Sequence, residues 1–243
     1  YDNATWDFTG PTDGYRHNVS YTVSPGVGKE GIQFHTLKLD LRKYYRFNRF
    51  YSVAARVMVG KSVGHDAQKF FLGGVYAWLF GRGETDGQKD SGQFRDVLLD
   101  TTNKSILKDV YFTEYAIPIR GARYAERVGT NVFMANFEFR FPFINYLSFG
   151  FPMRMIFGNI RGHAFLDVGA AWDNLDEFSN KDLLVNKYGN NISDEFSPWI
   201  GSLGLGVKIN LGYFLLRIDS AWDINPGWLY SRPQYYFSLG YDW

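Results

Sequence analysis

The chain of 243 residues contains no cysteine. Disulfide scaffolds, thiol nucleophiles and cysteine-based metal sites are therefore excluded. An excess of charge of either sign is also absent, because the chain has 26 basic and 25 acidic residues and a formal net charge of +1. Without a basic field or a long Lys/Arg run, the sequence does not favour a nucleic-acid partner.

Long hydrophobic runs are absent as well. No segment has the roughly 18 consecutive apolar residues that a transmembrane helix requires, and the mean hydropathy is -0.27. A bundle of membrane helices would not give this value. The strands of a membrane barrel would give such a value, because apolar and polar side chains alternate along them and the mean hydropathy stays near zero.

Catalytic motifs are missing too. Histidines stand alone at 17, 35, 65 and 163, without the spacing of a zinc site, and no nucleophile elbow or phosphate-binding loop occurs. The acidic residues Asp173, Asp176 and Glu177 have two interpretations, a cation site or solvated side chains, and the second is favoured. We therefore expect no enzyme, no metal and no cofactor.

Aromatic residues are abundant, at 19% of the chain, and they alternate with polar residues in the segment 132–143. Side chains on a strand point to opposite faces in turn. The polar face of this strand carries Asn136, Glu138 and Arg140. The other face carries Phe133, Ala135, Phe137, Phe139, Phe141 and Phe143.

The same alternation recurs along most of the chain, which gives too much apolar surface for one interior. We therefore predict an all-β fold, a transmembrane antiparallel up-and-down β-barrel that is apolar outside and polar within. About ten strands are expected, with a turn at 10–14 and a long inserted loop at about 80–131. The expected strands are 1–9, 15–24, 37–42, 51–59, 69–79, 132–143, 163–172, 202–210, 214–222 and 234–243.

Charged residues on the inward faces of two of these strands, 37–42 and 51–59, have two interpretations. Lys38, Asp40, Arg42 and Arg56 could line an ion path or form a salt-bridged wall. We favour the wall, since charges inside barrels usually pair.

Three motifs occur in order around the long loop: I-R-G at 119–121, N-F-E-F-R-F-P at 136–142 and F-L-D-V-G at 165–169. Together with F-L-G-G at 71–74 they resemble the C-terminal part of a barrel from the BamA/TamA bacterial surface antigen superfamily. The chain departs from that pattern at Ala122, where an aromatic residue is usual, so Tyr124 is expected to take its packing role. The resemblance implies one barrel domain over 1–243, supplying about ten strands of a sixteen-stranded barrel.

The resemblance implies that the loop containing Ile119, Arg120 and Gly121 folds into the lumen. A partly buried guanidinium needs a carboxylate partner, and the two groups can pair through two parallel hydrogen bonds. Glu138 and Asp167 both lie on inward faces. We therefore predict that Arg120 meets Asp167, with Glu138 and Arg140 nearby as partners in the barrel wall.

The last residues form an alternating strand that ends in an aromatic residue. Phe237, Gly240, Tyr241 and Trp243 resemble the C-terminal signal by which outer-membrane barrels are recognised for insertion. A plain alternative remains open, because any last barrel strand must end among interfacial aromatic residues. Both interpretations predict the bacterial outer membrane.

The sequence is compatible with three functions. The resemblance implies a BamA-like barrel that inserts, assembles or translocates proteins, with unfolded outer-membrane proteins, accessory periplasmic proteins and outer-membrane lipid or lipopolysaccharide as partners. The alternative is a passive pore or a membrane anchor for an upstream soluble domain. A soluble β-sandwich would require the phenylalanine faces to pack on each other.

Overall fold

The structure is a computed structural model that describes residues 1–7, 9–26, 31–74, 114–115, 119–122, 127–143, 160–179, 197–210, 214–225, 228–229 and 233–239. The main sheet, here called the barrel wall, contains ten strands. They are β1 (Thr5–Asp7), β2 (Gly10–Pro25), β3 (Gln33–Arg46), β4 (Ser52–Val63), β8 (Asn131–Pro142), β9 (Ile160–Trp172), β10 (Trp199–Asn210), β11 (Leu215–Asn225), β12 (Trp228–Leu229) and β13 (Gln234–Leu239).

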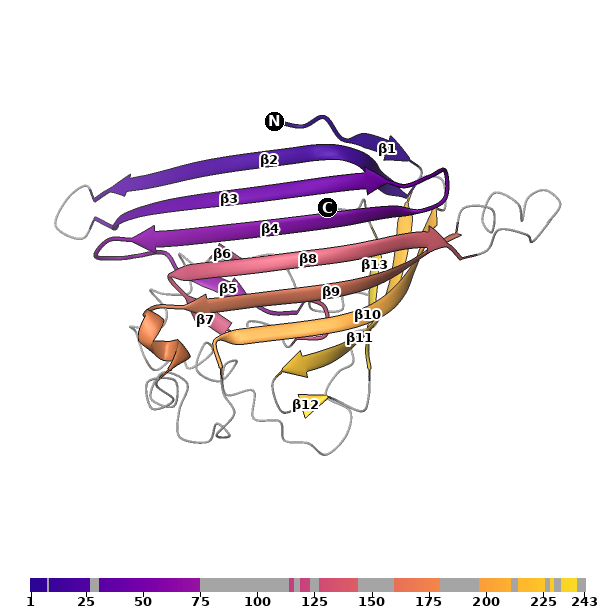
Figure 1. The fold of residues 1–243 in the computed structure, drawn as a ribbon. Coiled ribbons are helices and arrows are strands. Elements are labelled where there is room, and N and C mark those ends of the chain that lie inside the picture. Colours follow the sequence, from indigo (N-terminus) through magenta and orange to yellow (C-terminus); the bar gives the residue numbers. More distant parts are fainter. Residues whose placement is uncertain are drawn as a thin grey trace.

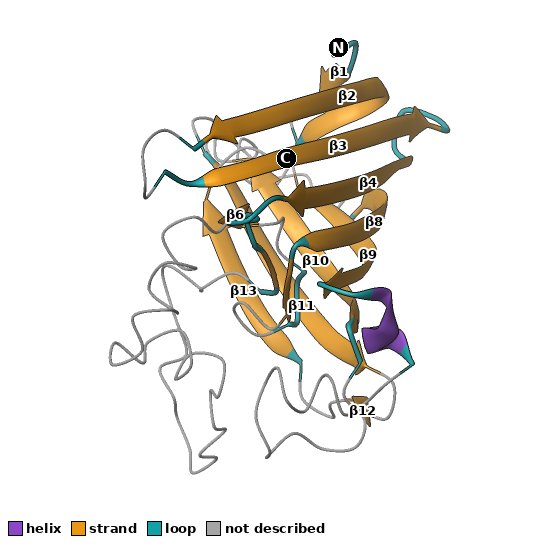
Figure 2. Cartoon of the chain, turned by 90° about the vertical axis from the view of Figure 1, so that its left-hand side faces the viewer, coloured by secondary structure: helices purple, strands orange, loops and turns teal. Residues whose placement is uncertain are grey.

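Neighbouring wall strands run antiparallel, in the order β1-β2-β3-β4-β8-β9-β10-β11, with β12 and β13 both paired to β11. The sheet curves from β2 through β8 and β9 to β13, so it has a concave side and a convex side (Figures 1 and 2). In the described chain no pairing joins β1 or β2 to β13. The wall is thus a partial, open barrel, and its concave side is called the lumen below.

The alternating pattern of the sequence sets the two faces of the wall. On β8 the phenylalanines face outward, and Phe137 and Phe139 are 47% and 36% exposed. Glu138, between them, is buried in the lumen. A soluble protein places these groups the other way round, so the soluble sandwich is excluded and the membrane barrel is confirmed.

The segment 10–14 was predicted to be a turn, and this prediction is wrong. It forms the first part of β2 and pairs with β1, with Trp6 opposite Pro11. Gly10 and Gly14 both have positive φ, at 126° and 99°. Glycine tolerates such values, so the strand bends here instead of ending.

A second, smaller sheet lies against the concave side of the wall. It consists of β5 (Phe70–Leu72), β6 (Glu114–Tyr115) and β7 (Arg127–Gly129), with β5 in the centre. It lies behind β8 and β9 in Figure 1. The segment 69–79 was predicted as a wall strand. The structure instead uses 70–72 in this inner sheet, and residues 75–79 lie outside the described residues.

Apolar side chains fill the space between the inner sheet and the wall. Phe70 and Leu72 are fully buried there, together with Met134 and Ile200 from the wall and Ile119 from the loop. The lumen therefore contains an apolar core at the inner sheet and, beside it, the charged residues described below.

Connections between wall strands differ in length. A short turn at 47–51 joins β3 to β4, whereas residues 64–130 separate β4 from β8. After β9, a 3₁₀ turn, η1 (Leu175–Phe178), begins with a capping box in which Glu177 accepts the backbone N–H of Asn174. Most of the loop expected at 80–131 lies outside the described residues, so the proposed domain limits stay a prediction. No described helix is long and apolar enough to cross a membrane.

Candidate functional site

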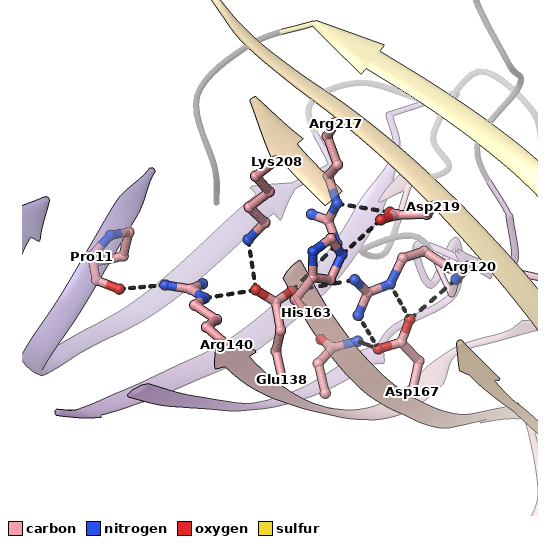
Figure 3. Close-up of polar contacts among 10 residues, drawn as sticks. Pro11, Arg120, Glu138, Arg140, His163, Asp167, Lys208, Arg217 and Asp219 are labelled. Atoms are coloured by element: carbon pink, nitrogen blue, oxygen red, sulfur yellow. Dashed lines mark hydrogen bonds and ion pairs between the residues drawn. The ribbon is translucent and has the colours of Figure 1, made fainter. Parts of the chain in front are cut away.

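The loop segment 119–122 places Arg120 against the lumen face of β9. Its Nε and Nη2 atoms donate to the two carboxylate oxygens of Asp167, each at 2.6 Å. Its backbone N–H also points at Asp167 Oδ2, at 3.3 Å. Both side chains are buried, so a two-point ion pair holds the loop to the wall (Figure 3).

Gly121 allows this close approach. Its φ is +90°, and a Cβ atom there would lie 3.1 Å from the Cβ of Ser202 and 3.2 Å from that of Ala221. The preceding residue, Ile119, is fixed by a hydrogen bond from its N–H to the carbonyl of Gly73 at 2.9 Å. The I-R-G sequence therefore fits a turn pressed against β10 and β11.

The carboxylate of Glu138 is surrounded by several cationic side chains. Its Oε1 accepts hydrogen bonds from Lys208 Nζ at 2.6 Å and from Arg140 Nε at 2.7 Å. Its Oε2 lies 3.3 Å from Arg120 Nη1 and 3.4 Å from Arg217 Nη2. Because Glu138 is only 1% exposed, these cations stabilise a charge that burial alone would make costly.

A second carboxylate on the wall continues the charged cluster. Asp219 binds Arg217 Nε and His163 Nε2, both at 2.7 Å. His163 is fully buried beside Gly206, where a Cβ atom would collide with both His163 and Asp219. The cluster thus joins β8, β9, β10 and β11 across the lumen side of the wall (Figure 3).

The surroundings keep the guanidinium of Arg120 charged. Its Cζ atom lies 3.5 Å from the centroid of the Phe165 ring, which supports it from one face. Burial alone would lower the pKa of Arg120, but the charges of Asp167 and Glu138 outweigh that effect and raise the pKa. The ion pair is therefore not lost through deprotonation of Arg120.

The last strand also contacts the loop. Gly121 N–H donates to the hydroxyl of Tyr236 on β13 at 2.9 Å, and that hydroxyl donates to Gln234 Oε1 at 2.7 Å. The loop is therefore attached to the middle of the wall through Asp167 and to its last strand through Tyr236.

The structure brings together Ile119, Arg120, Gly121, Glu138, Arg140 and Asp167 of the predicted site. Phe237 is on β13, directly after Tyr236. Tyr124 and the C-terminal Gly240, Tyr241 and Trp243 lie outside the described residues. The roles assigned to all of these residues, in a lumen loop or an insertion signal, stay predictions.

Several members of the cluster were missed from the sequence: His163, Lys208, Arg217, Asp219 and Tyr236. Alternation shows that most of them face inward, and this signal is available in the sequence. It does not show which strands are neighbours or in what register, and that information decides which charges meet.

The charges on β3 and β4 form a separate group. Asp40 accepts two hydrogen bonds from Arg56, at 2.9 and 2.6 Å, and one from Arg42 Nη2 at 2.7 Å. This pairing supports the interpretation as a salt-bridged wall. Among the described residues no group of three or more acidic or histidine side chains could hold a metal ion.

Comparisons with known proteins agree with this architecture. The family model of the Omp85 superfamily domain matches residues 3–243. Among solved structures, the chain resembles the crystal structure of BamA from Haemophilus ducreyi lacking POTRA domains 1–3, with a TM-score of 0.55 and 13% sequence identity. The match covers 98% of this chain and 40% of that chain, so this chain spans less than half of its relative. Comparison with curated protein sequences gives no significant match.

Proposed function

Because the chain belongs to the Omp85 superfamily of bacterial outer-membrane barrels, we propose that it forms part of a barrel that inserts or translocates proteins. The role is non-enzymatic: the barrel offers a strand edge and a lumen to a polypeptide and breaks no covalent bond. Unfolded outer-membrane proteins are the proposed substrates, with accessory periplasmic proteins as further partners.

The observation that carries this proposal is the attachment of one loop to two parts of the wall. Arg120 binds Asp167 on β9, and the neighbouring Gly121 binds Tyr236 on β13. A passive pore needs a loop that only fills the lumen. A loop bonded to the last strand can instead hold that strand in place while an incoming strand adds to its edge.

The edge itself belongs to β13. Gln234–Leu239 pairs with β11 along one side, from Gln234 opposite Ala221 to Leu239 opposite Leu216. Its other side has no strand partner in the described chain. Such an edge presents backbone donors and acceptors to which an incoming strand can add. We propose that β13 forms one side of a seam where substrate strands enter.

Site-specific crosslinking in cells tests the proposal. A photoreactive amino acid replaces Tyr235 on β13 of the intact protein, and Leu205 on β10 serves as the control. The two side chains are similarly exposed, at 62% and 54%, but β10 is paired on both sides. We expect newly made outer-membrane proteins to crosslink to position 235 and not to position 205.

Equal crosslinking at the two positions, or none at either, would contradict the proposal. It would favour the alternative, a passive pore or a membrane anchor for an upstream soluble domain.

A further inference from the structure

The cation Lys43 lies on the outward, apolar face of the barrel wall, near one end of β3. Lys43 follows Leu37 and Leu41 on the outward side of β3, and those leucines are 52% and 37% exposed. In the register, Lys43 lies between Tyr15 on β2 and Ala55 on β4. Its side chain is exposed, so it points toward lipid and not toward the lumen.

The neighbours of Lys43 are aromatic rather than acidic. Its Nζ atom lies 5.4 Å from the centroid of the Tyr15 ring, and that ring lies 4.9 Å from the ring of His17. No ion pair joins Lys43 to a carboxylate in the part of the chain that the structure describes. The ammonium group therefore has a ring face on one side and is open to a counter-charge on the other.

The position of Lys43 along β3 matches the edge of a membrane. The exposed rings of Tyr45 and Phe47 follow it, 4.9 Å apart at the turn between β3 and β4. Tyr45 is two residues further on, about 7 Å along the strand. An outward lysine costs about 2–4 kcal/mol at the bilayer midplane but nearly nothing at the interface. Lysine also extends its ammonium toward the interface, which brings the charge to the level of these rings.

We propose that Lys43, Tyr15 and Tyr45 form a binding site for the phosphate of an anionic phospholipid on the outer face of β2 and β3. The ammonium binds the phosphate, and the rings of Tyr15 and Tyr45 contact the glycerol and upper acyl region. The short β3–β4 turn assigns the site to the periplasmic side, because outer-membrane barrels have short periplasmic turns and longer external loops. The inference requires the membrane position of the barrel and is independent of any insertion activity.

Native mass spectrometry of the intact protein tests the site. Delipidated protein in detergent is titrated with phosphatidylglycerol and, separately, with phosphatidylcholine. We expect the wild type to prefer phosphatidylglycerol. Lys43→Gln should lower its binding about fivefold, which corresponds to roughly 1 kcal/mol for one lysine at an anionic surface. Lys43→Arg should keep the preference.

Lys61→Gln is the matched control. Lys61 is also exposed on the outward face, on β4, but it lies toward the opposite end of the wall, opposite Leu37. No ring contact is found for it among the described residues. Equal loss in the Lys43 and Lys61 variants, or no loss at Lys43, would overturn the proposal.

A second measurement requires no variant. Phosphatidylglycerol with a photoreactive head group is crosslinked to the wild-type protein, and the modified peptides are mapped. Adducts concentrated on the peptides that contain Tyr15, Lys43 and Tyr45 would support the site, and adducts spread evenly around both ends of the barrel would refute it.

Discussion

At the scale of single residues, the choice of arginine at 120 follows from geometry. The guanidinium reaches both oxygens of Asp167 at 2.6 Å and keeps a further nitrogen at 3.3 Å from Glu138. Lysine has no planar fork and could not make the same two parallel bonds. Arg120 therefore helps to set the loop's orientation, together with the backbone hydrogen bonds of Ile119 and Gly121.

Replacing Arg120 by Ala is expected to release the loop without unfolding the barrel. Removing one partner of a buried ion pair costs about 3–5 kcal/mol, because the remaining carboxylate is left uncompensated. Limited proteolysis should cut the loop faster than in the wild type, while the heat-dependent shift in gel mobility should be retained. Arg120→Lys should give an intermediate result. Loss of the gel shift in Arg120→Ala would contradict this prediction.

At the scale of elements, the last strand and the loop support one another. Tyr236 faces the lumen and its hydroxyl accepts the Gly121 N–H, while Tyr235 beside it faces outward and is 62% exposed. Because neighbouring side chains on a strand point to opposite faces, one strand contacts both the loop and the lipid.

Tyr236→Phe is expected to weaken this attachment by about 1 kcal/mol, the usual net value of one hydrogen bond. Hydrogen exchange should become faster at the amides of 119–122 and along β13. Tyr235→Phe is the control, since its side chain points away from the loop, and it should leave exchange unchanged. Equal exchange rates in the wild type and Tyr236→Phe would show that the contact does not hold the loop.

At the scale of the whole molecule, the distribution of polarity is inverted relative to a soluble protein. Buried charges gather in the lumen, and the exposed face of the wall is apolar. On β8 the outward aromatic face extends from Phe133 to Phe141, and the exposed Phe143 directly follows the strand. The aqueous stability of such a chain depends on detergent or lipid, because its largest apolar surface is outside.

Arginine at the centre of this face should impair folding into lipid vesicles in a depth-dependent way. Phe137→Arg is expected to cost about 2–4 kcal/mol, whereas Phe143→Arg, at the end of the strand, should cost about 0–1 kcal/mol. The folded fraction can be measured by gel mobility after refolding at increasing urea. Equal costs at both positions would mean that β8 does not span the bilayer as described.

Much of the wall could be predicted because a strand's alternation is local. The outward phenylalanines and inward Asn136, Glu138 and Arg140 were assigned from sequence spacing alone. Two assignments were wrong for a physical reason. Glycines at 10 and 14 suggested a turn, but a strand can bend at such residues and continue. The apolar segment after 69 suggested a wall strand, because alternation does not distinguish one sheet from another.

The sequence by itself determined which side chains face lipid and which face the lumen, since that depends only on a period of two residues. It also indicated that Arg120 needed a carboxylate. The tertiary structure decided which carboxylates and cations meet: the register of β8, β9, β10 and β11 brings Glu138 to Lys208 and His163 to Asp219. These contacts join residues far apart in the chain, so no local pattern encodes them.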